Sequence, residues 1–323
     1  MGQQEERIRL LVKISTLYYL DGMNQQEISN RLGVSRPQVS RLLAEAKTEG
    51  IVQIDIHNPF SEEQQYERAI SETFGIQDVI VVQSTGDDQG KEDVLLARAA
   101  ATLLESVIRD NDTVAIMAGR SIASAGARLR YNNTKGTSFV PMIGGFGSDG
   151  SSMHANTNTR IMAENMKGSY SLLNAPAIVV SSEAREHFLA ERDIANVLEK
   201  ARTADVAIVG IGQVTKESAI VQSGYLQSSE VEAIHKQGAV SQIGASFLKA
   251  DGEHLENELE SRIIGLSIGD IKKIANVIAI AGGKHKVEAI AAALRGKCMN
   301  VLITDLVTAK LVLEWNRLNP VSS

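Results

Sequence analysis

The chain has 323 residues, 43% of them hydrophobic, which is enough for two domains that each enclose a core. Its net charge of -6 argues against a general polyanion-binding protein, and an aromatic content of only 4% argues against base stacking on an aromatic platform. The single cysteine, Cys298, excludes a disulfide framework and a cysteine-based zinc site within one chain.

Targeting and membrane signals are weak throughout the sequence. The N-terminus has no long apolar segment behind a basic start, so it does not resemble a secretory signal peptide. No apolar run approaches the roughly 18 residues that a membrane helix requires. We therefore expect a cytoplasmic protein without a membrane partner.

The N-terminal region predicts three helices. Residues 7–21 have a helical pattern of apolar residues that ends at Gly22. The next helix should begin at Asn24 as its cap, with Glu27 as the capping-box partner, and end at Gly33. The first helix is then expected to pack under the two that follow it.

The third helix should begin at Ser35, with Gln38 as its capping-box partner and Pro37 tolerated in the first turn. One of its faces is apolar, and the opposite face is small and polar, as required of a helix that enters the DNA major groove. Arginine can bond guanine bidentately, and glutamine can do the same to adenine. The predicted DNA-binding residues are Gln25, Ser35, Arg36, Pro37, Gln38, Ser40 and Arg41.

Local charge supports the DNA-binding interpretation over its alternative, an ordinary helical hairpin in a bundle. Between residues 30 and 48 there are four basic side chains and one acidic side chain, although the whole chain is acidic. A short strand or wing is expected at residues 51–57, ended by Pro59. The acidic helix expected at residues 61–74 would link this region to a second domain.

From residue 78 onward, apolar β-branched strands alternate with helices. This alternation predicts a mostly parallel sheet with helices on both faces, which is an α/β fold. The expected strands are residues 78–82, 113–119, 137–145, 175–181, 205–212, 276–283 and 300–305, and the expected helices are residues 92–108, 121–129, 183–202, 286–296 and 306–316.

Four of these strands end in glycine, near residues 119, 144, 210 and 282. Ligands of open α/β sheets bind beyond the carboxyl ends of the strands, and glycine lets backbone N–H groups approach an anion. Lys284 or Lys286 could add a point charge and Arg120 a planar fork. His154, Asn156 and Asn158 follow the second turn and could bond hydroxyl groups. These residues favour a phosphorylated ligand with hydroxyl groups.

Nucleotide cofactors and catalysis receive little support. Residues 206–212 lack the three-glycine spacing of a dinucleotide site, and no phosphate loop ends in Gly-Lys-Ser/Thr, so we expect no cofactor. Asp305 and Asp270 could transfer protons by their positions, but both could equally cap helices. No compact catalytic group and no metal site is predicted.

Short ordered motifs extend along nearly the whole sequence. In the N-terminal region they are YY (18–19), DG (21–22), QQEI (25–28), LG (32–33), SR (35–36), VSRLL (39–43) and EGIV (49–52). Further along they are NAPA (174–177), ADVAIVGIG (204–212), SGY (223–225), AGG (281–283), KVEAI (286–290) and LITD (302–305). In these motifs the chain resembles the SorC/DeoR family of bacterial sugar-responsive transcription regulators, from about Arg7 to Val312.

The resemblance implies an effector domain of the kind shared with glucosamine-6-phosphate deaminase and ribose-5-phosphate isomerase, which binds a phosphorylated sugar or polyol without turning it over. The family pattern G-A-V-G-[DE], whose acidic residue bonds sugar hydroxyls, reads Gly-Ala-Val-Ser-Gln at residues 238–242. The residues carried over as effector ligands are Gly119, Arg120, Ser121, Gly144, Gly145, His154, Asn156, Gln242 and Lys286.

Two functional hypotheses follow. The first is a transcriptional regulator with a helix-turn-helix DNA-binding domain at residues 1–58 and a sugar-phosphate-sensing and oligomerisation domain at residues 59–323. Its partners would be double-stranded operator DNA, a phosphorylated sugar or polyol, and further copies of itself in a dimer or tetramer. The alternative is a sugar-phosphate isomerase or deaminase with an appended helical domain, whose turnover would depend on Asp305 or His154.

Overall fold

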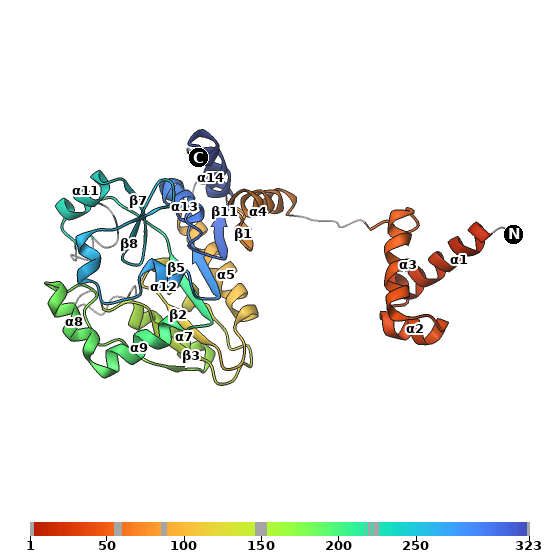
Figure 1. The fold of residues 1–323 in the computed structure, drawn as a ribbon, viewed down its shortest axis with the longest axis horizontal. Coiled ribbons are helices and arrows are strands. Elements are labelled where there is room, and N and C mark those ends of the chain that lie inside the picture. Colours follow the sequence, from red (N-terminus) through yellow and green to blue (C-terminus); the bar gives the residue numbers. More distant parts are fainter. Residues whose placement is uncertain are drawn as a thin grey trace. The chain divides into compact units, whose positions relative to one another are not determined.

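The computed structural model describes residues 3–54, 60–84, 89–145, 154–216, 218, 221 and 226–321. The chain forms two compact units, Met1–Pro59 and Phe60–Ser323. Each unit has a hydrophobic core of its own. The expected helix-turn-helix head and helix-flanked α/β domain are both present (Figure 1).

The first unit, called the head below, is helical. It consists of α1 (Gln3–Ser15), the π-helix η1 (Thr16–Leu20), α2 (Gln25–Leu32) and α3 (Arg36–Thr48). Helix α1 packs against α3, as expected. The core of the head consists of Leu11, Ile14, Leu17, Ile28, Val39, Leu42, Leu43 and Ala46.

The capping box of α2 forms as the sequence predicts. Asn24 Oδ1 accepts hydrogen bonds from the backbone N–H groups of Gln26 and Glu27, both at 3.0 Å, and the Glu27 carboxylate accepts from Asn24 N at 2.8 Å. Gly33 ends the helix with a left-handed φ of 68°. The capping bonds fix the start of α2, and the left-handed Gly33 begins the turn to α3.

Replacing Asn24 with alanine removes the acceptor of two helix N–H groups. We expect α2 to lose about 0.5–2 kcal/mol of stability, equivalent to roughly 2- to 30-fold faster amide exchange. Hydrogen–deuterium exchange of the full-length protein checks this, with α14 (Leu306–Leu318) of the second unit as the internal control. Unchanged protection of α2 would show that tertiary packing alone holds it.

The second unit is built on a seven-stranded sheet in the order β1-β11-β10-β5-β2-β3-β4, in which all neighbouring strands are parallel. Such a sheet needs cover on both faces, which explains its continuous apolar strands. Its strands are β1 (Asp78–Val82), β2 (Thr113–Ile116), β3 (Ser138–Pro141), β4 (Ser169–Tyr170), β5 (Val206–Gly210), β10 (Asn276–Ile280) and β11 (Val301–Asp305).

Helices flank this sheet (Figure 1). Helix α5 packs against α6, which packs against α7, while α9 contacts β2 and β3, and α14 contacts β1. The helices are α4 (Ser61–Phe74), α5 (Gln89–Val107), α6 (Arg120–Gly126), α7 (Ala155–Met166), α8 (Ser182–Ala190), α9 (Arg192–Arg202), α11 (Ser228–Lys236), α12 (Ile268–Ile271), α13 (Val287–Arg295) and α14, with 3-10 turns η2 (Glu258–Arg262) and η3 (Lys284–Lys286).

A second sheet was not predicted. It is antiparallel, in the order β6-β7-β8-β9, and consists of β6 (Gly212–Gln213), β7 (Ala239–Ile243), β8 (Ser246–Lys249) and β9 (His254–Leu255). Because β6 follows β5 after a single residue, this sheet extends from the carboxyl edge of the parallel sheet. Helix α7 was also not predicted.

Four local predictions differ from the structure. Residues 175–181 are not a strand, because they make only single bridges, from Pro176 to Gly145 and from Ile178 to Ile263. The helix expected at 183–202 is two helices, since the backbone is extended at Glu191. Residues 51–54 are not a strand, and the rest of the expected wing lies outside the described residues. Helix α4 is no linker, because it packs on β1 and α14.

Among the described residues, no helix combines the length and the apolar character that crossing a bilayer requires.

Candidate functional site

The outer face of α3 is positioned by the burial of its inner face. The inner side chains, Val39, Leu42, Leu43 and Ala46, lie in the head core, so their opposites must face solvent. Every α3 residue predicted to bind DNA is exposed, as is Ser35 at its cap: Ser35, Arg36, Pro37, Gln38, Ser40 and Arg41. Helix α3 therefore presents a polar surface with two arginines.

The capping pattern of α3 leaves Gln38 available to a ligand. Ser35 Oγ accepts from Gln38 N at 3.4 Å, as predicted. In the described structure the Gln38 side chain does not accept the Ser35 N–H that would complete the predicted capping box. No described residue bonds the side chain of Arg36 or Arg41 either. The acidic side chain of this region, Glu45, is paired with Arg7 through two bonds of 2.6 and 2.7 Å. The basic character of the α3 surface is therefore not offset by Glu45.

A cleft of about 390 Å³ adjoins this surface in the head. It is lined by Tyr18 of the π-helix, by Asn24, Gln25 and Gln26 at the start of α2, and by Arg36 in the first turn of α3. The predicted DNA-binding residue Gln25 thus lies beside Arg36. Tyr18 carried the family resemblance but was not predicted as a DNA-binding residue, because its position depends on the five-residue π-helix η1.

In the second unit, the register of the parallel strands brings three glycine turns to one edge. Ile116 of β2 pairs with Ile208 of β5, and Gly210 at the end of β5 pairs with Ile280 at the end of β10. The turns that follow these strands therefore lie next to one another at the carboxyl ends, where open α/β sheets bind their ligands. We call this region the sheet-edge site.

A group of basic side chains meets at the sheet-edge site. Burial lowers the pKa of Lys286, and the charge of Arg120 lowers it further, while Asp93 of α5 opposes both. Burial and the charges of Lys286 and Arg120 likewise lower the pKa of His285. Because these groups repel one another's positive charge, a bound anion would be stabilised here. The sequence analysis named Arg120 and Lys286, whose charges influence one another here, and did not name His285 or Asp93.

Helix α7 contacts the first glycine turn, at Gly119, through the side chain of Asn158. Gly119 has a φ of 150°, which favours glycine, and it immediately precedes Arg120 and the half-buried Ser121. Asn158 Nδ2 lies 3.4 Å from the backbone oxygens of Met117 and Gly119. The Asn158 side chain is 1% exposed, and its Oδ1 has no hydrogen-bond partner within the described structure. Asn158 is thus a structural support of this turn.

Gln242 reaches the sheet-edge site through the second sheet. It pairs with Gly212, and its Nε2 donates to Gly244 O at 2.8 Å. The neighbouring Gln213 Nε2 donates to the backbone oxygen of His285. The antiparallel sheet therefore connects Gln242 to the turn that contains Lys286, an arrangement that sequence spacing does not reveal.

The second glycine turn has a different role from the one expected. Gly144 N donates to Ile264 O at 2.9 Å, and Gly145 N donates to Ala175 O at 2.8 Å, so neither amide is left for an anion. A Cβ at Gly144 would lie 2.6 Å from the backbone oxygens of Ala175 and Pro176. Glycine is required at residue 144 by this close crossing of two segments. Gly147 and Ser148, which follow Gly145 in the second glycine-rich segment, lie outside the described residues.

Two predicted ligands sit on α7. Asn156 exchanges two hydrogen bonds with the backbone of Leu173, donating to its oxygen and accepting from its N–H, each at 3.0 Å. This exchange ties α7 to the segment after β4, a structural role that the sequence did not predict for Asn156. His154 occupies the N-cap position of α7 and is half-buried. The SGY motif at 223–225 lies outside the described residues.

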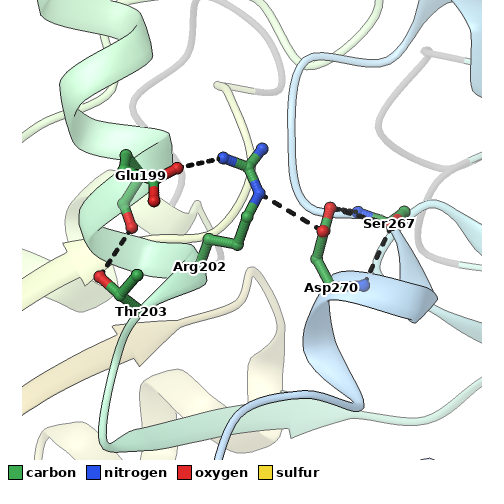
Figure 2. A network of polar contacts seen from close by, with 5 residues as sticks. All are labelled: Glu199, Arg202, Thr203, Ser267 and Asp270. Carbon is green, nitrogen blue, oxygen red and sulfur yellow. Dashed lines mark hydrogen bonds and ion pairs between the residues drawn. The ribbon is translucent and has the colours of Figure 1, made fainter.

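Both carboxylates considered for proton transfer are structural. Asp305, 1% exposed, accepts hydrogen bonds from Thr308 N at 2.8 Å, Thr308 Oγ1 at 2.5 Å and Gly283 N at 2.9 Å. Asp270 forms a capping box with Ser267 and an ion pair of 3.3 Å with Arg202, which in turn bonds Glu199 (Figure 2).

Comparisons with known proteins agree with this arrangement. Residues 58–314 match a family model described as "Putative sugar-binding domain". The transcriptional regulator LsrR of Escherichia coli (strain K12) is 34% identical over 316 residues, which cover 96% of this chain and 95% of that protein. The deoxyribonucleoside regulator of Bacillus subtilis (strain 168) is 29% identical over 309 residues, with coverage of 96% and 98%.

Among solved structures, the full-length sorbitol operon regulator SorC from Klebsiella pneumoniae matches with a TM-score of 0.73 and 26% identity, covering 95% of this chain and 98% of that chain. These relatives are regulators, so the enzymatic alternative is not favoured. The long family match and the near-complete coverage confirm the resemblance: the chain belongs to the SorC/DeoR family of sugar-binding transcriptional regulators.

Proposed function

We propose that this protein is a cytoplasmic, DNA-binding transcriptional regulator of a carbohydrate-utilisation operon, controlled by a phosphorylated sugar or polyol. The observation that carries the proposal is the exposed face of α3, where Arg36, Gln38 and Arg41 have no partner among the described residues. Residues 1–58 would read the operator, and residues 59–323 would sense the effector. The relatives, which regulate transcription, support this division.

The sheet-edge site is proposed to bind the phosphate of the effector. Arg120 and Lys286 would supply positive charge, and Gln242 and His154 would bond hydroxyl groups. A homo-oligomer, dimer or tetramer, would place two heads on neighbouring half-sites of an operator. For the effector to control DNA binding, it must bind the DNA-competent and incompetent states with different affinities.

A thermal-shift screen of the full-length protein against pentose, hexose and polyol phosphates tests the sensing half. A compound that binds the folded protein raises its melting temperature by mass action. We expect a phosphorylated compound to raise it where its unphosphorylated form does not. A panel in which only unphosphorylated sugars act would overturn the phosphate assignment.

Lys286→Met should greatly reduce that thermal shift, because it removes a half-buried positive charge from the sheet-edge site. Lys284→Met is the matched control, since Lys284 is in the same 3-10 turn but exposed. The control should keep the full response to the same compound. An equal response of both variants would remove Lys286 from the site.

A further inference from the structure

The cleft in the head is lined by neutral and cationic side chains that can donate hydrogen bonds. The main acceptor of Asn24, its Oδ1, is occupied by the N–H groups of Gln26 and Glu27, and Gln26 Nε2 donates to Asn30 Oδ1. Three lining groups have no hydrogen bond within the described structure and can donate to a ligand: the Tyr18 hydroxyl, the Gln25 side-chain amide and the Arg36 guanidinium.

Negative charge is missing from this cleft. No carboxylate is among its described lining residues. The adjacent carboxylate, Glu27, accepts the Asn24 N–H at 2.8 Å and is thereby held at the helix start. A cleft that combines a guanidinium with a phenol and an amide, and that holds no acid, suits an anionic oxygen group.

The π-helix contributes Tyr18 to the lining of the cleft. Residues 16–20 form one wide turn at the end of α1, and the half-buried Tyr18 lies within it, edge-on to Tyr19 with ring centroids 4.9 Å apart. Single π-turns of this kind are frequent at functional sites. Three elements, η1, α2 and α3, therefore contribute side chains to one small opening.

We infer that this cleft is a phosphodiester subsite, in which Tyr18, Gln25 and Arg36 hold one phosphate of the DNA backbone. The inference rests on the proposed function, and it assigns two different roles to the residues of the α3 surface. Arg36, in the first turn and inside the cleft, positions the duplex, while Gln38 and Arg41, outside the cleft lining, contact base edges. Arg36 was assigned to the DNA surface from the sequence without this distinction.

Salt-dependent binding to two duplexes tests the division. The probes are a duplex selected from a random library by the wild-type protein and a mixed-sequence duplex of equal length. Arg36→Ala should weaken binding to both by the same factor and lower the slope of log K against log salt by about 0.9 per engaged head. Tyr18→Phe should weaken both equally with no change of slope, because it removes a neutral hydrogen bond.

Gln38→Ala is the control within the same helix, and it should weaken binding to the selected duplex alone. Arg36→Lys should restore the salt slope, which shows that charge and not folding was lost. If Arg36→Ala weakens the selected duplex alone, or leaves the slope unchanged, the subsite is wrong while the proposed function stands. If the wild-type protein selects no duplex, the proposed function itself fails.

Discussion

Arg41→Ala is expected to weaken binding to the selected operator duplex by about 1–3 kcal/mol, or roughly 5- to 150-fold, and to relax base preference at one position. The reason is geometric. Leu42 and Leu43 are buried, so Arg41 on the opposite side of α3 faces outward, and no described residue pairs with it. Its guanidinium can then bond one guanine through two parallel hydrogen bonds.

A gel-shift titration with the selected and the mixed-sequence duplex measures this effect. Arg9→Ala is the matched control, because Arg9 is an exposed arginine of α1 that pairs with Glu5 at 3.3 Å, away from the reading face. It removes the same charge and should leave base preference intact. Unchanged affinity and preference in Arg41→Ala would exclude Arg41 from the reading surface.

Asp305→Ala is expected to destabilise the second unit by roughly 2–4 kcal/mol, because it strands buried donors and removes a helix cap. Gly283 N and Thr308 N would lose a carboxylate acceptor in a site that is almost inaccessible to water. Urea denaturation followed by the fluorescence of Trp315, the one tryptophan of the chain, measures the change, since Trp315 lies in α14, the helix that Asp305 caps.

A second substitution, Asp305→Asn, separates a structural from a catalytic role of this carboxylate. Asp305→Asn keeps the volume and one acceptor oxygen, so its loss of stability should be smaller than that of Asp305→Ala. The wild-type protein should form no product from the sugar-phosphate panel. Sustained turnover that disappears in a stably folded Asp305→Asn protein would restore the enzymatic alternative.

Local chemistry explains which parts of the fold could be predicted. The caps at Asn24 and Ser35 depend on residues at most three positions away, and both form. The strands β1, β10 and β11 were predicted because their apolar β-branched runs are long and uninterrupted. The same signal misled at residues 175–181, where the segment makes only single bridges, to Gly145 and to Ile263, and Val180 is 88% exposed.

The site was harder to predict because it depends on strand order. Arg120 meets His285 and Lys286 only because β5 lies between β2 and β10, an order that no short motif encodes. Gly144 shows the opposite error. A glycine after a strand looked like an anion-binding turn, but its missing side chain serves the close approach of residues 175 and 176.

The start of the last helix has a practical consequence for exchanging heads between relatives. Helix α14 begins at the carboxylate that holds Gly283, and along its length it packs against α4, the first helix after residue 59. Helix α4 is therefore a structural part of the second unit, although its acidic sequence predicted a linker. A chimaera should take the head of the relative up to residue 59 and keep the native sequence from Phe60 onward. A junction placed after Phe74 would replace α4 with a helix that is not matched to β1 and α14.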